Sequence, residues 1–252
     1  RTMFCVYSFL FPWTQQSRMV LKPLLQAYDL GLRTGDTESA MYSIYHWLTI
    51  KYTVGSPIES LEADIALYLK QMKDLKRDQA VKLTKSLYQM ILNLLGKNNS
   101  DDPTNFSGQA LSLEDFNKAK RDTFWMVSVS LYRGALFTYF GEHIRHADMV
   151  VEFGHNFLAK AHLASPNIAV DTFLKGVSCF AAARQTRKKK YIKLAKICRS
   201  KIKKWLDMGN PNVKHYDTFL DAEARALRGK RFAAIKHYEV TILLAARSGY
   251  QQ

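Results

Sequence analysis

The chain has 252 residues, of which 47% are hydrophobic and 23% are charged. This composition supports a folded core and excludes a mainly disordered chain. The few glycines (12) and prolines (6) exclude collagen-like and low-complexity sequences and disfavour a fold of many short strands. Lys and Arg outnumber Asp and Glu by 37 to 22, which gives a formal net charge of +15.

The sequence begins with an apolar stretch, residues 3–11, that follows Arg1 and has two interpretations. A charged residue before an apolar run is typical of a signal peptide, but no A-x-A cleavage site follows Trp13. We favour the end of a buried helix that belongs to a larger protein. The three cysteines have no zinc or redox spacing, which favours free thiols in a reducing compartment and hence a cytoplasmic protein. No apolar run approaches the ~18 residues that suggest a membrane-spanning helix.

Apolar residues recur at helical spacing along most of the chain, and Gly or Pro falls between the segments. The pattern predicts about ten helices, over residues 17–33, 36–53, 57–74, 77–95, 113–140, 142–162, 167–185, 187–208, 212–229 and 231–248. Three prolines follow a capping residue, at Ser56-Pro57, Ser165-Pro166 and Asn210-Pro211, and they predict helix starts. Capping boxes are expected at Ser56 and Ser112, each with an acidic residue three positions later.

The polar, turn-rich segment 96–112 separates residues 1–95 from residues 113–252. We expect a surface loop between helix pairs, and it is the best candidate for proteolytic nicking. The whole of residues 1–252 is predicted to be one helical-repeat domain, a piece of a larger protein.

The clearest repeat unit lies near the end of the chain. Small residues at Ala222, Ala226 and Ala234 allow two helices to approach closely, Gly229 supplies the turn between them, and Tyr238 and Ile242 are expected to fill the space between the helices. This spacing resembles a tetratricopeptide repeat.

A second, weaker copy of the unit runs from Tyr28 through Gly35 and Ala40 to Ile44-Tyr45, with Asp36 as the cap of its second helix. A third, with degraded spacing, lies at Ala135, Gly141 and Ala147. The repeats predict a right-handed α-solenoid of about five antiparallel helix pairs.

A wider resemblance covers nearly the whole chain. It is carried by Trp13, Tyr28, Gly31, Gly35, Asp36 and Ala40 in the first half, by Met90 to Leu94 with Gly96 and Gly108 in the middle, and by Trp205, Asn210, Pro211, His215, Gly229, Ala234, Tyr238, Gly249 and Tyr250 at the end. These stretches resemble the tetratricopeptide-like helical region of large multi-sensor signalling proteins. Such proteins carry a kinase-like domain, an AAA-type ATPase module, this helical region, and often GAF and histidine-kinase domains.

The resemblance implies a non-catalytic scaffold that couples a nucleotide-binding module to downstream signalling domains. It implies neighbouring domains of the same chain as partners, and it carries no ATP or phosphorylation site onto these residues. The sequence itself contains neither G-x-x-x-x-G-K-[ST] nor G-x-G-x-x-G. We therefore predict no enzymatic activity, no cofactor and no metal for this segment, although His143 and His146 share a helix face.

The positive charge is concentrated in residues 184–204, which hold 11 Lys or Arg and no acid. Removing these 11 charges from the total of +15 leaves +4 on the rest of the chain. Ile192, Ala195, Cys198, Ile202 and Trp205 predict the inward face of this helix. The candidate interaction surface comprises Arg184, Arg187, Lys188, Lys189, Lys190, Lys193, Lys196, Arg199 and Lys203.

This surface is open to several interpretations. A solvated face or a contact within the parent protein is favoured, followed by an acidic protein partner. Anionic lipid and nucleic acid rank lower, because the apolar stripe is needed for the core and no groove-reading motif accompanies it. The alternative to the coupling scaffold is a stand-alone protein- or peptide-binding module that uses helix 184–204 to bind an acidic partner.

Overall fold

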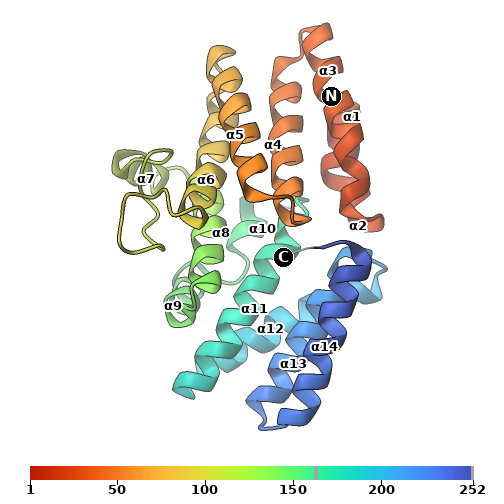
Figure 1. The fold of residues 1–252 in the computed structure, drawn as a ribbon, viewed down its shortest axis with the longest axis vertical. Helices are drawn as coiled ribbons and strands as arrows, with labels where there is room; N and C mark the ends of the chain where they lie inside the picture. Colours follow the sequence, from red (N-terminus) through yellow and green to blue (C-terminus); the bar gives the residue numbers. More distant parts are fainter. Residues whose placement is uncertain (162–163, 251–252) are drawn as a thin grey trace. The chain divides into compact units, whose positions relative to one another are not determined.

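The structure is a computed structural model that describes residues 1–161 and 164–250, and over these residues it contains helices, turns and loops but no strand (Figure 1). The predicted all-α class is therefore confirmed. The contacts divide the chain into two compact units. The first comprises residues 1–12 and 16–136, and the second comprises residues 13–15 and 137–250. The loop 96–112 lies inside the first unit, and the boundary at residue 136 lies within a helix.

The first half of the chain forms short helical segments at its start, then four long helices, and then a loop followed by two further helices. Their bounds are α1 (Thr2–Cys5), the π-helical turn η1 (Val6–Leu10), α2 (Phe11–Thr14), the 3₁₀ turn η2 (Ser17–Val20), α3 (Leu21–Thr34), α4 (Thr37–Thr53), α5 (Ile58–Asp74), α6 (Asp78–Leu94), α7 (Leu113–Ala119) and α8 (Thr123–Tyr139). Helices α3 to α6 stand side by side as an up-and-down array (Figure 1).

The α3–α4 hairpin is built on small residues, as the repeat pattern predicts. Gly35 has a φ of 79°, a left-handed conformation that ends α3 and that only glycine adopts without cost. Asp36 accepts a hydrogen bond from the backbone N–H of Ser39 at 3.1 Å, which confirms it as the cap of α4. A Cβ placed on Gly31 would lie 2.9 Å from the Cβ of Ala40, so the two helices meet at these residues.

Helix α4 is the centre of the first unit, because most of its side chains are buried. Lys51 of α4 pairs with Asp64 of α5 at 2.5 Å, and the rings of Trp47 and Tyr68 meet edge to face at 5.9 Å. On another side, the N-terminal segment contacts α4 through Phe4, whose ring stacks on Tyr42 at 5.9 Å. The apolar stretch at residues 3–11 is thus helical in the structure.

The loop 96–112 is held by two amide side chains of α6. The Oε1 atom of Gln89 accepts hydrogen bonds from the backbone N–H groups of Ala110 and Leu111, at 3.1 and 3.0 Å. The amide of Asn93 donates to the carbonyls of Pro103 and Asn105, at 2.7 and 2.8 Å. Both amides are buried, so the loop is fastened to the helix rather than merely lying on the surface.

Three local predictions differ from the structure. The expected capping box at Ser56 is wrong, because Pro57 is the N-cap of α5 and no side chain caps that end. The helix predicted over 113–140 is two helices, since a turn at residues 120–122 lets the side chain of Asp122 accept from the N–H of Trp125 and start α8. The helix predicted over 142–162 is broken at Gly154, where φ is 87°, and its last residue lies outside the described part of the chain. The capping box at Ser112 is confirmed.

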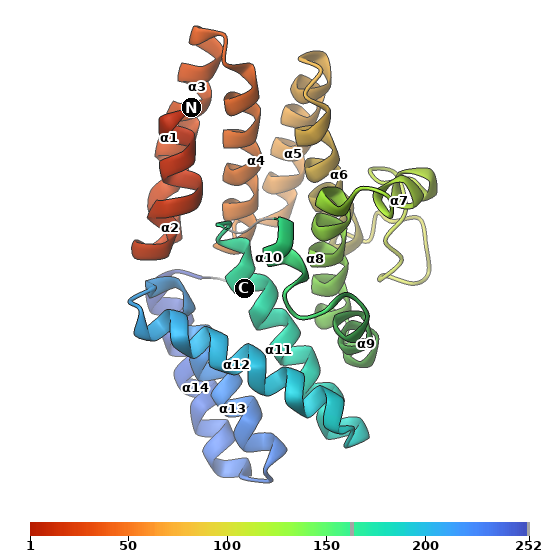
Figure 2. The same ribbon diagram turned by 180° about the vertical axis from the view of Figure 1, so that it is seen from behind.

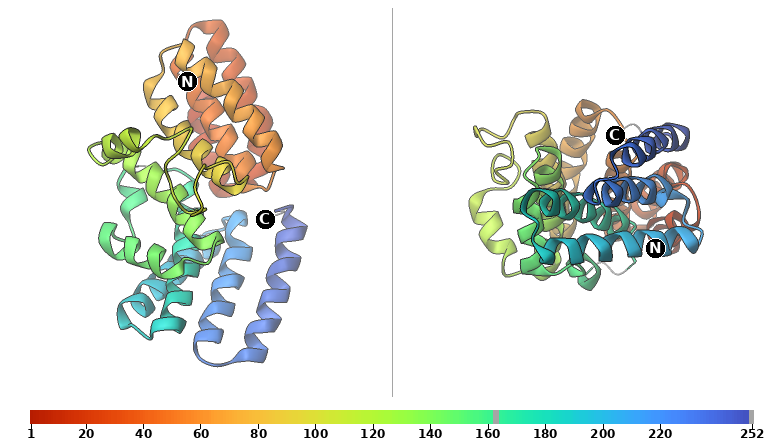
Figure 3. Two further views of the ribbon diagram at one scale, coloured as in Figure 1. Left: turned by 60° about the vertical axis from the view of Figure 1, so that its left-hand side comes forward. Right: turned by 90° about the horizontal axis from the view of Figure 1, so that it is seen from below.

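The second half of the chain contains a short α9, a one-turn helix and four long helices. Their bounds are α9 (His143–Phe153), α10 (Phe157–Ala161), α11 (Asn167–Thr186), α12 (Lys189–Asp207), the 3₁₀ turn η3 (Pro211–Val213), α13 (Lys214–Leu227) and α14 (Arg231–Ser248). Figure 2 shows α12 lying against α11 and α13, and α13 and α14 form an antiparallel hairpin (Figure 3).

The core of the second unit lies between α9, α11, α12 and α13. A Cβ on Gly176 of α11 would lie 2.9 Å from the side chain of Leu220 in α13, so these two helices also approach closely. Cys179 and Cys198 are buried in this unit as free thiols, whereas Cys5 in the first unit is exposed.

The α13–α14 hairpin largely follows the predicted repeat unit. Gly229 has a φ of 73°, and Ala222 and Ala234 are buried where the helices meet, while Ala226 is half-buried. Tyr238 packs edge to face on Phe219. The prediction for Ile242 is wrong. Its side chain is 68% exposed, and Thr241 is the residue that faces inward at this point.

Candidate functional site

Helix α12 carries the candidate interaction surface. Arg187 ends helix α11 with a left-handed φ of 57°, and α12 begins two residues later. One side of α12 is buried in the core of the second unit. The buried residues are Tyr191, Ala195, Cys198 and Ile202. The predicted amphipathic helix is therefore present, with two corrections. Tyr191, not Ile192, is the first buried residue, and Ile192 and Trp205 pack against the core as predicted although both are only half-buried.

Four of the nine candidate cations are engaged by acidic residues of the same unit. Arg184 pairs with the buried carboxylate of Glu223, which also accepts a hydrogen bond from the hydroxyl of Tyr238. Arg199 pairs with Asp221. These contacts join α11 to α13, α13 to α14, and α12 to α13. The two arginines therefore stabilise the packing of these helices and are not free to bind a partner.

The other two engaged cations lie at the two ends of α12. Lys190 pairs with Asp148 of α9 at 2.8 Å, and Tyr191 donates its hydroxyl proton to the same carboxylate at 2.7 Å. The hydrogen bond to Asp148 raises the pKa of Lys190, and the hydrogen bond from Lys190 lowers the pKa of Asp148. Lys203 pairs with Asp207 one turn away at 2.8 Å, and this hydrogen bond raises the pKa of Lys203.

The remaining five cations are exposed. Arg187 and Lys188 lie in the turn before α12, where the ammonium of Lys188 lies 5.9 Å from the ring centre of Tyr191. Lys189, Lys193 and Lys196 follow one another along the outer side of α12. Within the described part of the chain, no acidic side chain forms an ion pair with these three lysines.

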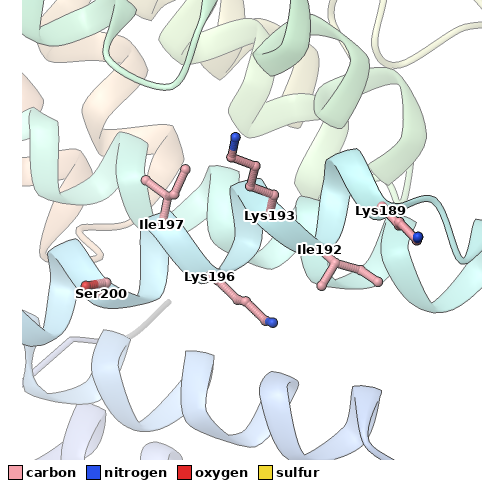
Figure 4. Close-up of a pocket in the computed structure, with 6 residues that line it drawn as sticks. All are labelled: Lys189, Ile192, Lys193, Lys196, Ile197 and Ser200. Atoms are coloured by element: carbon pink, nitrogen blue, oxygen red, sulfur yellow. The ribbon is translucent and has the colours of Figure 1, made fainter.

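These three lysines surround an open hollow of about 490 Å³ that lies on α12. We call its lining the lysine face, and it comprises Lys189, Ile192, Lys193, Lys196, Ile197 and Ser200. Figure 4 shows Lys193 and Ile197 along one edge of this face and Ile192 and Lys196 along the other. The two isoleucines are half-buried, so they supply an apolar floor between the ammonium groups.

The lysine face is electrostatically uncompensated. The amino-terminal end of a helix carries a partial positive charge, so Lys189 in the first turn of α12 is unfavourably placed unless an anion approaches. Ammonium groups beside aliphatic side chains suit a ligand that combines carboxylates with an apolar group.

A second polar cluster, in the interior of the same unit, contains the two histidines that the sequence analysis weighed as metal ligands. His146 Nδ1 lies 3.0 Å from Ser178 Oγ and 2.9 Å from Thr138 Oγ1, and His143 Nδ1 lies 3.3 Å from Ser178 Oγ. Burial lowers the pKa of His146 to about 3, with a smaller contribution from the charge of Lys175. Over the described residues, no group of three or more His, Cys, Asp or Glu side chains could hold a metal.

Sequence reasoning did not find the buried ion pair on α11. Lys175 and Asp171 lie one turn apart at 2.6 Å, and both side chains are less than a tenth exposed. Burial raises the pKa of Asp171 although the ammonium of Lys175 opposes this shift. The i, i+4 spacing of the two residues was the only signal of this pair in the sequence.

Comparison of the chain with protein-family models, curated proteins and solved structures returns no match. The resemblance to multi-sensor signalling proteins therefore stays a prediction. In the part of the chain that the structure describes, no helix has both the length and the apolar character needed to cross a membrane.

Proposed function

We propose that the chain is a non-catalytic helical-repeat region of a larger cytoplasmic signalling protein, in which it couples a nucleotide-binding module to downstream signalling domains. In this proposal the helix pairs form a right-handed α-solenoid. The observation that supports it best is the shared design of two hairpins. Gly35 and Ala40 in α3–α4 have the same spacing and roles as Gly229 and Ala234 in α13–α14.

Repeats of this kind suit a coupling role. Each helix pair is stabilised mainly by its neighbours, so a displacement imposed on one pair is passed to the next. The test is enzymatic and genetic. The purified chain should show no ATP hydrolysis and no phosphotransfer above a control without protein. The same reading frame should encode a P-loop ATPase module before these residues and a histidine-kinase or related domain after them. Turnover by the chain alone would contradict the proposal.

The lysine face favours a second candidate function, the binding of an acidic protein segment. Lys189, Lys193 and Lys196 have no acidic partner within the described residues, and Ile192 and Ile197 provide apolar contact between them. An extended or helical segment with several Asp or Glu residues and one or two aliphatic side chains fits this pattern. Such binding should weaken steeply as the salt concentration rises, because exposed charges are screened.

This candidate is tested by charge reversal with a matched control. The triple variant Lys189→Glu, Lys193→Glu and Lys196→Glu should lose binding of a fluorescent acidic peptide, measured by anisotropy, and should keep the wild-type helicity. The control is Lys22→Glu, Lys70→Glu and Lys73→Glu, which has the same change in net charge at exposed lysines of α3 and α5. Equal loss in both variants would indicate an effect of net charge alone and would refute a specific site on α12.

A further inference from the structure

Helix α14 exposes an unusually apolar outer face. Phe232 is 88% exposed, Ile242 68% and Leu243 57%, and Ile235 is also exposed. These side chains are separated by three, seven and one residues, spacings that place them within about 100° of one another around the helix, on one side of it. Together they expose on the order of 500 Å², at the upper end of what a monomer ordinarily presents. We call these four residues the α14 outer face.

Helix α4 of the first unit occupies the same position in the α3–α4 hairpin as α14 occupies in the α13–α14 hairpin. Helices α4 and α14 each follow a left-handed glycine, Gly35 or Gly229, and each places an alanine five residues later against the preceding helix. This correspondence aligns residue n of α4 with residue n + 194 of α14. The comparison concerns each hairpin by itself and does not depend on how the two units are placed.

The residues of α4 that correspond to the α14 outer face are buried, with one exception. Ile235, Ile242 and Leu243 correspond to Met41, Leu48 and Thr49, all of which are 2% exposed or less. The exception is Phe232, whose counterpart Glu38 is exposed. Both helices therefore have apolar side chains on this side, Met41 and Leu48 in α4, but only α4 has the side covered.

Other helices pack against α4, and the contacts of Tyr45 place α8 on this side of it. Helix α6 packs against α4, and Tyr45, at the centre of the covered side, lies close to Ser128 and Tyr132 of α8. Each covering helix is amphipathic or largely apolar. In α6 the buried residues Leu83, Leu87 and Met90 follow one another along one stripe.

We infer that the α14 outer face is a docking surface for an amphipathic helix of another helical segment, which covers it as other helices of the first unit cover α4. The occupant presents aliphatic side chains at intervals of three and four residues toward Ile235, Ile242 and Leu243. Glu239 stands where α4 has Tyr45, so the occupant also carries a Lys or Arg beside its apolar stripe. This inference rests on the hairpin correspondence and not on the signalling role proposed above.

The test uses the full chain and a fluorescent peptide with the sequence of residues 77–95, which contains α6. Fluorescence anisotropy should show saturable binding that weakens at least tenfold in the double variant Ile242→Glu and Leu243→Glu. The double variant Leu67→Glu and Met208→Glu, at residues that are 63% and 73% exposed outside α14, is the matched control and should bind as the wild type does. A peptide with Leu83, Leu87 and Met90 replaced by Gln should not bind.

The charge at Glu239 is tested separately. The peptide with Ser86→Lys, which places an ammonium beside the apolar stripe, should bind more tightly than the unmodified peptide. Glu239→Gln in the chain should remove this difference. An unchanged preference would show that no cation is recognised at this position.

Three results would overturn the inference. The first is no binding of the 77–95 peptide by the wild-type chain. The second is binding that the Ile242→Glu and Leu243→Glu variant retains. The third is a dimer of the chain, seen by sedimentation equilibrium, that this variant abolishes while the peptide fails to compete, because a second copy would then be the occupant.

Discussion

Acidification should destabilise the second unit through His146. This imidazole is buried, and its Nδ1 atom lies within hydrogen-bond distance of Thr138 and Ser178. Burial is the main reason that its pKa falls from 6.5 to about 3, and the positive charge of Lys175 and the neighbouring His143 add to the effect. In the folded chain the ring is therefore neutral at every pH above about 4.

The sign and size of the effect follow from the two pKa values. Because the folded pKa is the lower one, the unfolded chain binds a proton between pH 6.5 and pH 3 that the folded chain does not bind. Stability from this residue is thus fully present above pH 6.5 and is lost as the pH falls toward 3. Between pH 7 and pH 4.5 the loss amounts to about 2–3 kcal/mol in the free energy of unfolding.

The assay is urea unfolding of the wild type and of His146→Gln at pH 7 and pH 4.5, followed by circular dichroism. The variant should be less stable at pH 7 because it disturbs the hydrogen bonds, but its loss on acidification should be smaller than the wild-type loss by about 2–3 kcal/mol. Carboxylates and His215 contribute equally to both proteins, so the difference isolates His146. The ring proton shifts of His146, followed by NMR, give an independent check. Equal pH dependence in the two proteins, or titration of His146 near pH 6.5, would refute the reasoning.

Three further predictions concern packing and reactivity. Gly31→Ala should lower the stability of the chain by about 1–3 kcal/mol in urea unfolding, since the added methyl would meet Ala40 and backbone at 2.9 Å; an unchanged midpoint would mean that the hairpin can open there at no cost. Glu223→Ala should cost about 1–3 kcal/mol, because it removes the buried partner of a partly exposed arginine and of a tyrosine, and a thermal midpoint within a degree or two of the wild type would contradict this role. A thiol reagent at pH 8 should modify the exposed Cys5 in the native chain well before Cys198, whose pKa burial raises to about 12; mass spectrometry of the labelled peptides would show the reverse order if the packing around α12 were wrong.

Patterns that repeat along the chain were predictable from the sequence. The apolar periodicity located the long helices, and the glycine and alanine spacing located the turns at Gly35 and Gly229 and the close contacts that follow them. The same rules failed where two local signals compete. Ser56 and Glu59 have the residue types and spacing of a capping box. The structure instead places Pro57 at the N-cap of α5, and no side chain caps this end of the helix.

Side-chain partners that are distant in sequence could not be predicted. The basic helix appeared as a run of eleven cations, and nothing in the pattern showed which of them were engaged. Asp148 lies 42 residues from Lys190, and Glu223 lies 39 residues from Arg184. Only the fold brings these acids to α11 and α12, and it leaves five of the nine candidate cations without an acidic partner among the described residues, three of them in the lysine face.

The attachment of the loop 96–112 makes the path of the loop depend on two side chains of helix α6. Gln89 and Asn93 occupy successive turns of α6. Their side-chain amides form hydrogen bonds with four backbone groups of the loop, two N–H groups and two carbonyls. The loop has no helix or strand of its own, although hydrogen bonds within it close turns. The two amides hold it at separate places, Asn93 at residues 103 and 105 and Gln89 at residues 110 and 111. Replacing one amide should therefore loosen the loop at one place and leave the other attachment intact.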